Sequence, residues 1–125
     1  MIARFIGRSG RPELHIIDSK GKIESEFILP YKTIGSGAEK ADHILQGEWN
    51  DGMSMKDFAR LGYCIIKFIE DIDPHGSVGG DPHIRYLPYG STKDIEPTEH
   101  EWTEFREFFP KCVNDFRKRY SRIAE

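Results

Sequence analysis

The sequence has few cysteines, no long apolar run and no large excess of charge. Two cysteines among 125 residues are too few for the disulfide framework of a small secreted domain. No apolar stretch approaches the roughly 20 residues that a membrane-spanning helix needs, and the N-terminus lacks the pattern of a signal peptide. The net charge of −3 does not favour nucleic acid or anionic membranes. We therefore predict a cytoplasmic protein that binds neither.

The composition is that of one folded domain. Hydrophobic residues make up 38% of the chain and charged residues 31%, which is a globular mixture. A chain of 125 residues fits one domain with a modest core. We treat residues 1–125 as a single domain in which residues 98–125 form a C-terminal helix.

Alternating apolar residues and turn residues predict strands in the first third of the chain. Short apolar segments at 2–6, 13–17, 22–29 and 31–34 are separated by turn residues such as Gly21. Glutamates alternate with apolar residues in the third segment, which indicates one buried and one solvated face. Successive hairpin-like strands favour an α+β fold, with an antiparallel sheet covered by helices.

Three polar pairs at capping-box spacing predict where helices begin. The pairs are Ser36 with Glu39, Ser54 with Asp57, and Thr98 with Glu101. Apolar residues at helical spacing follow each pair, most clearly from Met55 to Ile72. Pro110 is expected to kink or divide the last helix, and a further strand is expected at 83–87. Both cysteines lie within these helical patterns and are predicted to be buried thiols.

Two Asp-Pro-His tripeptides flank a glycine-rich loop at 76–80. Their carboxylates and imidazoles are side chains that hold divalent ions. The four candidate ligands are Asp73, His75, Asp81 and His83. No HExxH or CxxC motif accompanies them, and Asp-Pro is common in turns. We therefore predict no metal and no cofactor, and keep a small metal- or ligand-binding module as an alternative.

A glycine-rich junction leads from the fourth predicted strand into the first predicted helix. It consists of Gly35, Ser36 and Gly37, and free N–H groups at a helix start can bind an anion. The junction is shorter than a dinucleotide fingerprint or a P-loop, so a simple helix cap is the favoured interpretation. No histidine lies near either cysteine in sequence, and no serine has a GxSxG context, so spacing predicts no catalytic constellation.

Four features of residues 5–86, taken in order and spacing, resemble the C-terminal half of a proteasome-type subunit of the N-terminal-nucleophile hydrolase superfamily. The features are a hairpin at 13–21, the Gly-Ser-Gly junction within 33–38, two adjacent helices around 53–55 and a Gly-Gly turn at 78–80. The resemblance implies half of a four-layer αββα sandwich. It also implies that the half with the threonine nucleophile and its lysine is absent.

The resemblance implies a domain that is not active as an enzyme alone. In this family the free amine of the N-terminal threonine is the general base, whereas this chain begins with Met1 and Ile2. Ser36 matches a serine that supports the nucleophile in active members. His75 and Val78 stand where active members have an acidic residue and a serine before the Gly-Gly turn. No complete catalytic site is therefore expected.

The expected function is that of a non-catalytic proteasome-like domain with a structural or assembly role. Half of a sandwich would expose an apolar sheet face and strand edges, which predicts a homo-oligomer or a proteasome-like partner chain. One alternative is the C-terminal part of a threonine-type peptidase whose nucleophile lies on a missing segment or a partner chain. The other is the ligand- or metal-binding module, using the loop at 73–83.

Overall fold

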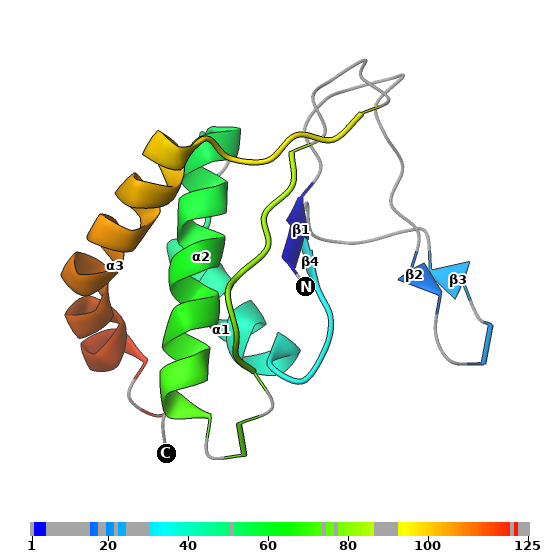
Figure 1. The fold of residues 1–125 in the computed structure, drawn as a ribbon. Coiled ribbons are helices and arrows are strands. Elements are labelled where there is room, and N and C mark those ends of the chain that lie inside the picture. The colour runs from blue at the N-terminus through cyan, green and yellow to red at the C-terminus, as the bar shows by residue number, and fades with distance from the viewer. Residues whose placement is uncertain are drawn as a thin grey trace.

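Helices make up most of the described structure. The computed structural model describes residues 2–4, 16–17, 20–21, 23–24, 31–50, 52–73, 75–76, 78–86, 93–120 and 122. Its three helices are α1 (Ala38–Glu48), α2 (Met55–Ile72) and α3 (Glu99–Arg119), with 11, 18 and 21 residues. Figure 1 shows α2 at the centre, with α1 and α3 packed beside it. Within the described residues, no helix has the length and apolar character needed to cross a bilayer.

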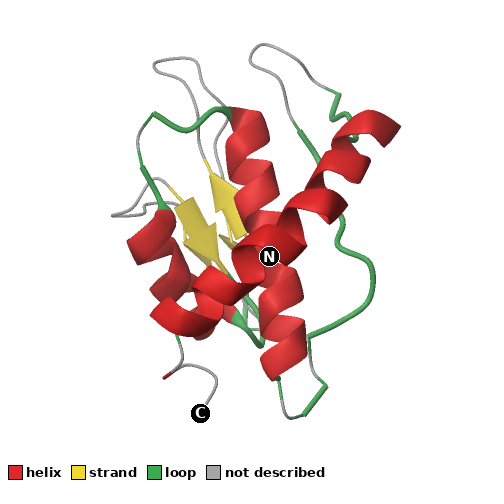
Figure 2. Ribbon diagram, turned by 90° about the vertical axis from the view of Figure 1, so that its left-hand side faces the viewer, coloured by secondary structure: helices red, strands yellow, loops and turns green. Residues whose placement is uncertain are grey.

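The strands are short and form two separate antiparallel pairs (Figure 1). The helices enclose the pair that is visible in Figure 2. They are β1 (Ile2–Arg4), β2 (Ile16–Ile17), β3 (Ile23–Glu24) and β4 (Tyr31–Thr33). β1 pairs with β4, so that Ile2 lies opposite Thr33, and β2 pairs with β3. Figure 1 shows β2 and β3 apart from the three helices. The strands therefore do not share one sheet.

The predicted α+β fold, an antiparallel sheet covered by helices as in half of an αββα sandwich, is wrong. The described part is mainly helical, and each strand has two or three residues. The strand expected at 83–87 is reduced to a single bridge between Tyr86 and Ile95. Two-stranded pairs offer no broad apolar face, so the core forms between helices instead. The N-terminal-nucleophile hydrolase fold is overturned by the same finding. Parts of the predicted strands, including 5–6 and 25–29, lie outside the described residues.

Two of the three predicted helix starts are confirmed. The Thr98 hydroxyl accepts the Glu101 N–H at 3.1 Å, and the Glu101 carboxylate accepts the Thr98 N–H at 3.1 Å. The Ser54 hydroxyl accepts the Asp57 N–H at 3.0 Å. α3 then continues through Pro110 without being divided, although proline cannot donate the usual helical hydrogen bond there.

The third predicted capping box, at Ser36, is wrong. The N-cap of α1 is Gly37, which makes no side-chain cap. A Cβ atom at Gly37 would lie 3.2 Å from side-chain carbons of Ile69 and of Val78. Close packing against α2 and the following loop therefore explains the glycine, and it moves the helix start one residue along.

Several contacts between α2 and α3 follow one register, in which a residue of α2 meets the α3 residue 48 positions later. Both helices run in the same direction (Figure 1). Lys56 forms an ion pair with Glu104 at 2.6 Å. One turn farther along both helices, the Arg60 guanidinium lies 4.1 Å from the centre of the Phe108 ring. Two turns farther on, the rings of Phe68 and Phe116 are 5.6 Å apart. In each of these three pairs the α3 residue comes 48 positions after the α2 residue. The pairs are four and eight residues apart along each helix, which is close to one and two helical turns.

The strand β4 joins this helical core at α1. Tyr31 is buried, and its ring meets that of Trp49 edge-on at 5.5 Å. The Thr33 hydroxyl, also buried, donates a 2.6 Å hydrogen bond to the Asp42 carboxylate on α1. One residue from each end of β4 thus attaches the β1–β4 pair to the first helix. The largest fully buried side chains belong to the helices: Phe68, Phe105, Ile44, Leu45, Ile65 and Cys64.

Candidate functional site

The predicted glycine-rich junction lies on the surface between β4 and α1. Gly35 has φ of +102°, a conformation that favours glycine, and Ser36 is exposed beside it. Gly37 is half-buried against α2. Ligand binding by these three residues, and the supporting role expected for Ser36, remain predictions. A single helix N-terminus offers N–H groups but no selectivity for one anion.

The four candidate metal ligands do not form a cluster. The Asp73 carboxylate accepts the backbone N–H of His75 at 3.1 Å and that of Val78 at 2.9 Å. It therefore closes the turn after α2, as aspartates often do. His75, Asp81 and His83 are exposed. Within the described residues, no group of three or more His, Cys, Asp or Glu is placed to hold a metal ion.

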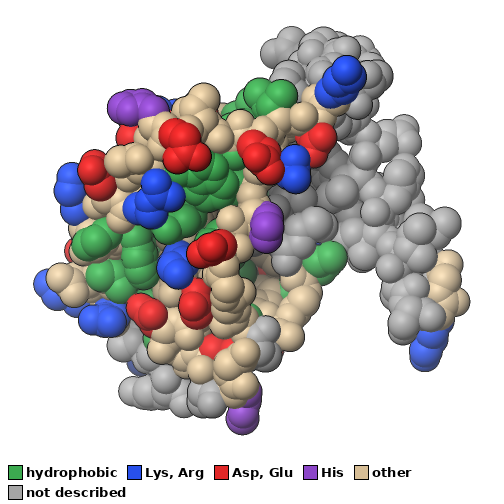
Figure 3. Space-filling view, in the orientation of Figure 1, with side chains coloured by type: hydrophobic (Ala, Val, Ile, Leu, Met, Phe, Trp, Pro, Cys, Tyr) green, Lys and Arg blue, Asp and Glu red, His purple; other side chains and the backbone are tan. Residues whose placement is uncertain are grey.

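A pocket that the sequence did not predict opens between α2, α3 and the end of α1. Its volume is about 220 Å³. Apolar and charged residues both line it: Glu48, Met53, Asp57, Arg60, Leu61, Phe108, Cys112, Asp115, Phe116 and Arg119. On the face shown in Figure 3, apolar side chains surface among charges of both signs over α2 and α3. We call this feature the α2–α3 pocket.

The charged residues of the α2–α3 pocket mostly pair with one another. Arg119 lies 2.7 Å from the Glu48 carboxylate. Arg60 covers the Phe108 ring and lies 3.7 Å from Asp57. The pocket lining contains three carboxylates and two guanidinium groups. The third carboxylate, on exposed Asp115, makes no ion pair within 4.0 Å of another described residue but interacts electrostatically with Arg119. The lining therefore has one more carboxylate than guanidinium groups.

Tyr120 fixes the Glu48 side of the pocket. Its hydroxyl donates a 3.0 Å hydrogen bond to the same Glu48 oxygen that contacts Arg119. Burial, followed by this hydrogen bond, raises the pKa of Tyr120 to about 12. The phenol is therefore a neutral donor at physiological pH. It positions the carboxylate and does not act as a base.

The two thiols lie on α2 and α3, and their predicted burial is confirmed. Cys112 lines the pocket, whereas Cys64 on α2 has no exposed surface. A hydrogen bond between the thiols, together with burial, raises the pKa of Cys64. The same bond lowers the pKa of Cys112, although burial opposes this effect. Cys112 also donates to the Phe109 carbonyl at 3.3 Å.

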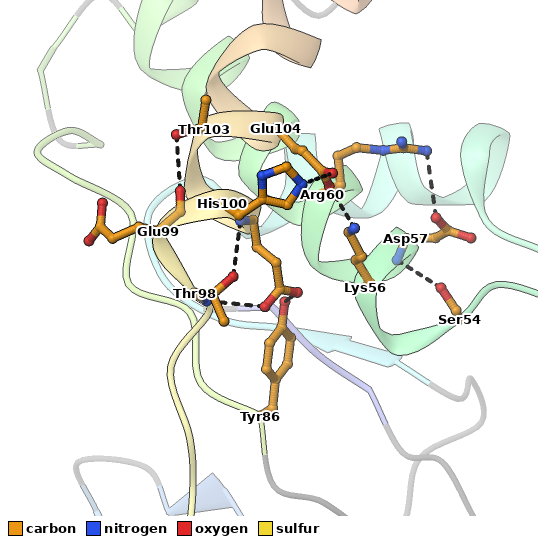
Figure 4. A network of polar contacts seen from close by, with 11 residues as sticks. Ser54, Lys56, Asp57, Arg60, Tyr86, Thr98, Glu99, His100, Thr103 and Glu104 are labelled. Atoms are coloured by element: carbon orange, nitrogen blue, oxygen red, sulfur yellow. Dashed lines mark hydrogen bonds and ion pairs between the residues drawn. The ribbon is translucent and has the colours of Figure 1, made fainter.

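A second polar cluster joins the N-terminal ends of α2 and α3 (Figure 4). Glu104 accepts from Lys56 at 2.6 Å and lies 2.9 Å from His100. The hydrogen bond from Lys56 lowers the pKa of Glu104. The Tyr86 hydroxyl donates to the capping residue Glu101 at 3.4 Å. These contacts are largely exposed and explain how the helix starts are aligned, with no group poised for chemistry.

Comparisons of this chain with protein-family models, curated proteins and solved structures find no match. The resemblance to proteasome-type subunits therefore gains no support from them and stays a prediction. Sequence spacing could not have located the α2–α3 pocket, because its residues come from three helices and the segment between α1 and α2. The two cysteines on apolar helix faces were the one indication that this interface contains reactive groups.

Proposed function

We propose that this chain is a non-catalytic domain with an assembly role, and that it binds a partner protein through the α2–α3 pocket. The observation that carries the proposal is the make-up of this pocket. Apolar side chains such as Leu61, Phe108 and Phe116 line it, and paired charges surround them. Protein interfaces have this arrangement, with an apolar centre and a polar rim.

The size of the pocket favours a protein side chain over a small molecule. Sites for drug-sized ligands and cofactors usually have volumes of about 300–1,000 Å³, whereas this pocket has about 220 Å³. It has room for one or two large side chains. Binding energy at interfaces is concentrated in such anchor residues, which fill pockets near the centre of the contact.

The rim charge indicates what lies next to the anchor. With Asp115 the lining has three carboxylates and two guanidinium groups, and each arginine already contacts another acid. A lysine or arginine beside the anchor would complement the excess carboxylate. We therefore specify the partner as a protein segment with a large apolar side chain next to a basic one.

The proposal retains only part of the original expectation. It keeps the assembly role and the need for a partner chain or a second copy, but it does not include the sandwich fold. Neither the peptidase alternative nor the metal-binding alternative is favoured by a specific contact. A cytoplasmic location is part of the proposal, because the two buried cysteines are free thiols, as is usual in reducing compartments.

Selection from a displayed peptide library would test the proposal. We expect the selected peptides to share a large apolar residue adjacent to Lys or Arg. Binding should weaken at least about tenfold with Asp115→Lys, which is a modest effect for a lost charge pair plus new repulsion. The matched control is Glu107→Lys, an exposed residue of α3 outside the pocket lining, which should leave binding unchanged.

Two results would decide against the proposal or redirect it. Peptides without a shared anchor, or equal binding by both variants, would contradict a role for the α2–α3 pocket. Light scattering of the purified chain tests whether the partner is a second copy. A dimer that Asp115→Lys dissociates and Glu107→Lys does not would identify self-association as the assembly role.

A further inference from the structure

The register of α2 and α3 places the two cysteines opposite each other. Cross-helix pairs at a separation of 48 residues occur at Arg60, with Phe108, and at Phe68, with Phe116. The step midway between these pairs falls on Cys64 and Cys112. Each cysteine is thus flanked, one turn before and one turn after, by residues in direct contact across the interface.

The spacing of packed helices suits a bond between these thiols. Packed helix axes lie about 8–10 Å apart, and each Cα lies about 2.3 Å from its own axis. Cα atoms that face each other directly therefore lie about 3.4–5.4 Å apart, a range that overlaps the distances of about 4.4–6.8 Å found in disulfides. Both thiols are buried in this interface.

We propose that Cys64 and Cys112 are a redox-active dithiol that a peroxide entering the α2–α3 pocket oxidises to a disulfide joining α2 to α3. This inference does not depend on a binding partner. The proposed function assigns the pocket to a protein side chain, whereas this inference assigns chemistry to the thiols beneath it. The substrate class is a small hydroperoxide, because the pocket is too small for a large oxidant.

Cys112 reacts first, because it lines the pocket while Cys64 lies behind it. Its thiolate sulfur attacks one peroxide oxygen, and the O–O bond breaks. The departing oxygen takes up a proton and leaves as water or an alcohol, so Cys112 becomes a sulfenic acid.

Cys64 then completes the disulfide. Its thiol loses a proton, and the sulfur attacks the Cys112 sulfur, so that the S–S bond forms while the S–O bond breaks. The departing hydroxide takes up the proton and leaves as water. Over both steps the two thiols lose two electrons, and the peroxide gains them.

The cross-link closes a loop of about 50 residues and thereby restricts the unfolded chain, which raises the melting temperature by on the order of 10 °C. The test treats the reduced, purified full chain with hydrogen peroxide. We expect the intact mass to fall by two hydrogen atoms. Peptide mapping without reductant should link Cys64 to Cys112 within one molecule, and dithiothreitol should reverse both changes.

Two variants assign the order of reaction. In Cys64→Ala the sulfenic acid has no second thiol to resolve it, so dimedone should label Cys112. In Cys112→Ala the remaining thiol is shielded, and dimedone should leave it unlabelled. The wild-type result decides the matter even if a variant folds poorly. Two thiols that still react with maleimide after peroxide treatment and unfolding, or a disulfide between two molecules, would overturn the proposal.

Discussion

The α2–α3 interface and the β4–α1 junction hold the molecule together in different ways. Along α2 and α3, several contacts join residues 48 positions apart, from Lys56 with Glu104 to Phe68 with Phe116. At the junction, a short strand is attached by two side chains, Tyr31 on Trp49 and Thr33 on Asp42. The repeated contacts distribute stability over many residues, whereas the junction depends on a few.

Truncating the core of the interface should have the largest effect. Phe68 is fully buried and meets Phe116 edge-on. Phe68→Ala removes a ring that the surroundings cannot replace, and we expect a loss of about 3–5 kcal/mol in the free energy of unfolding. Urea denaturation followed by circular dichroism would measure it. A loss below about 1 kcal/mol would show that this interface is not the core.

Two glycines on helices should respond to alanine in opposite directions. At Gly47 in α1, an added Cβ would collide with the Tyr120 hydroxyl, which is already held by Glu48. We expect Gly47→Ala to cost about 1–3 kcal/mol from overpacking. At Gly62 in α2, an added Cβ would meet no atom within 4 Å. Gly62→Ala should therefore stabilise the fold by about 0.5–1 kcal/mol through helix propensity alone.

Thermal melts of the two variants side by side would test this pair of expectations, and each variant serves as the control for the other. Melting temperatures that shift in the same direction would mean that the α1–α3 contact at Tyr120 is looser than its hydrogen bonds indicate. Opposite shifts would show that α3 packs closely against α1 as well as against α2.

The helices could be predicted from sequence because their signals are local. A capping residue and its partner lie three positions apart, as at Thr98 and Glu101, and the apolar stripe of α2 repeats every three or four residues. The α1 start was misplaced at Ser36 because the deciding contact is not local. Ile69 and Val78 approach Gly37 from other parts of the chain.

The sheet was mispredicted for the same physical reason. Alternation in a segment such as 22–29 predicts an extended backbone but does not specify which strand pairs with it, and strand preference depends strongly on neighbours. The α2–α3 pocket also escaped prediction, because its lining depends on the crossing of three helices. The thiols were predicted to be buried, but their contact depends on a register that appears only when α2 and α3 are folded side by side.

Removing one hydroxyl tests how much the junction depends on single contacts. Thr33→Val keeps the shape of the side chain but deletes the donor to Asp42, leaving a half-buried carboxylate oxygen without its partner. We expect a loss of about 1–3 kcal/mol. Thr33→Ser keeps the hydroxyl and is the matched control. Equal stability of the two variants in urea denaturation would show that shape, and not the hydrogen bond, attaches β4 to α1.

The smallest expected effect concerns the exposed end of the α2–α3 interface. The Lys56 ammonium lowers the pKa of Glu104 below its usual 4.5, so the carboxylate binds protons more weakly in the folded state than in the unfolded chain. Its contribution to stability is complete above the unfolded pKa and is lost as the pH falls through the folded one. Glu104→Gln should therefore be less stable than wild type near neutral pH, and this difference in the free energy of unfolding should shrink as the pH falls below about 4.5. Glu107→Gln, an exposed neighbour on α3, is the control. A gap that stays constant across this acid range would mean that the 2.6 Å pair with Lys56 aligns the helices without stabilising them.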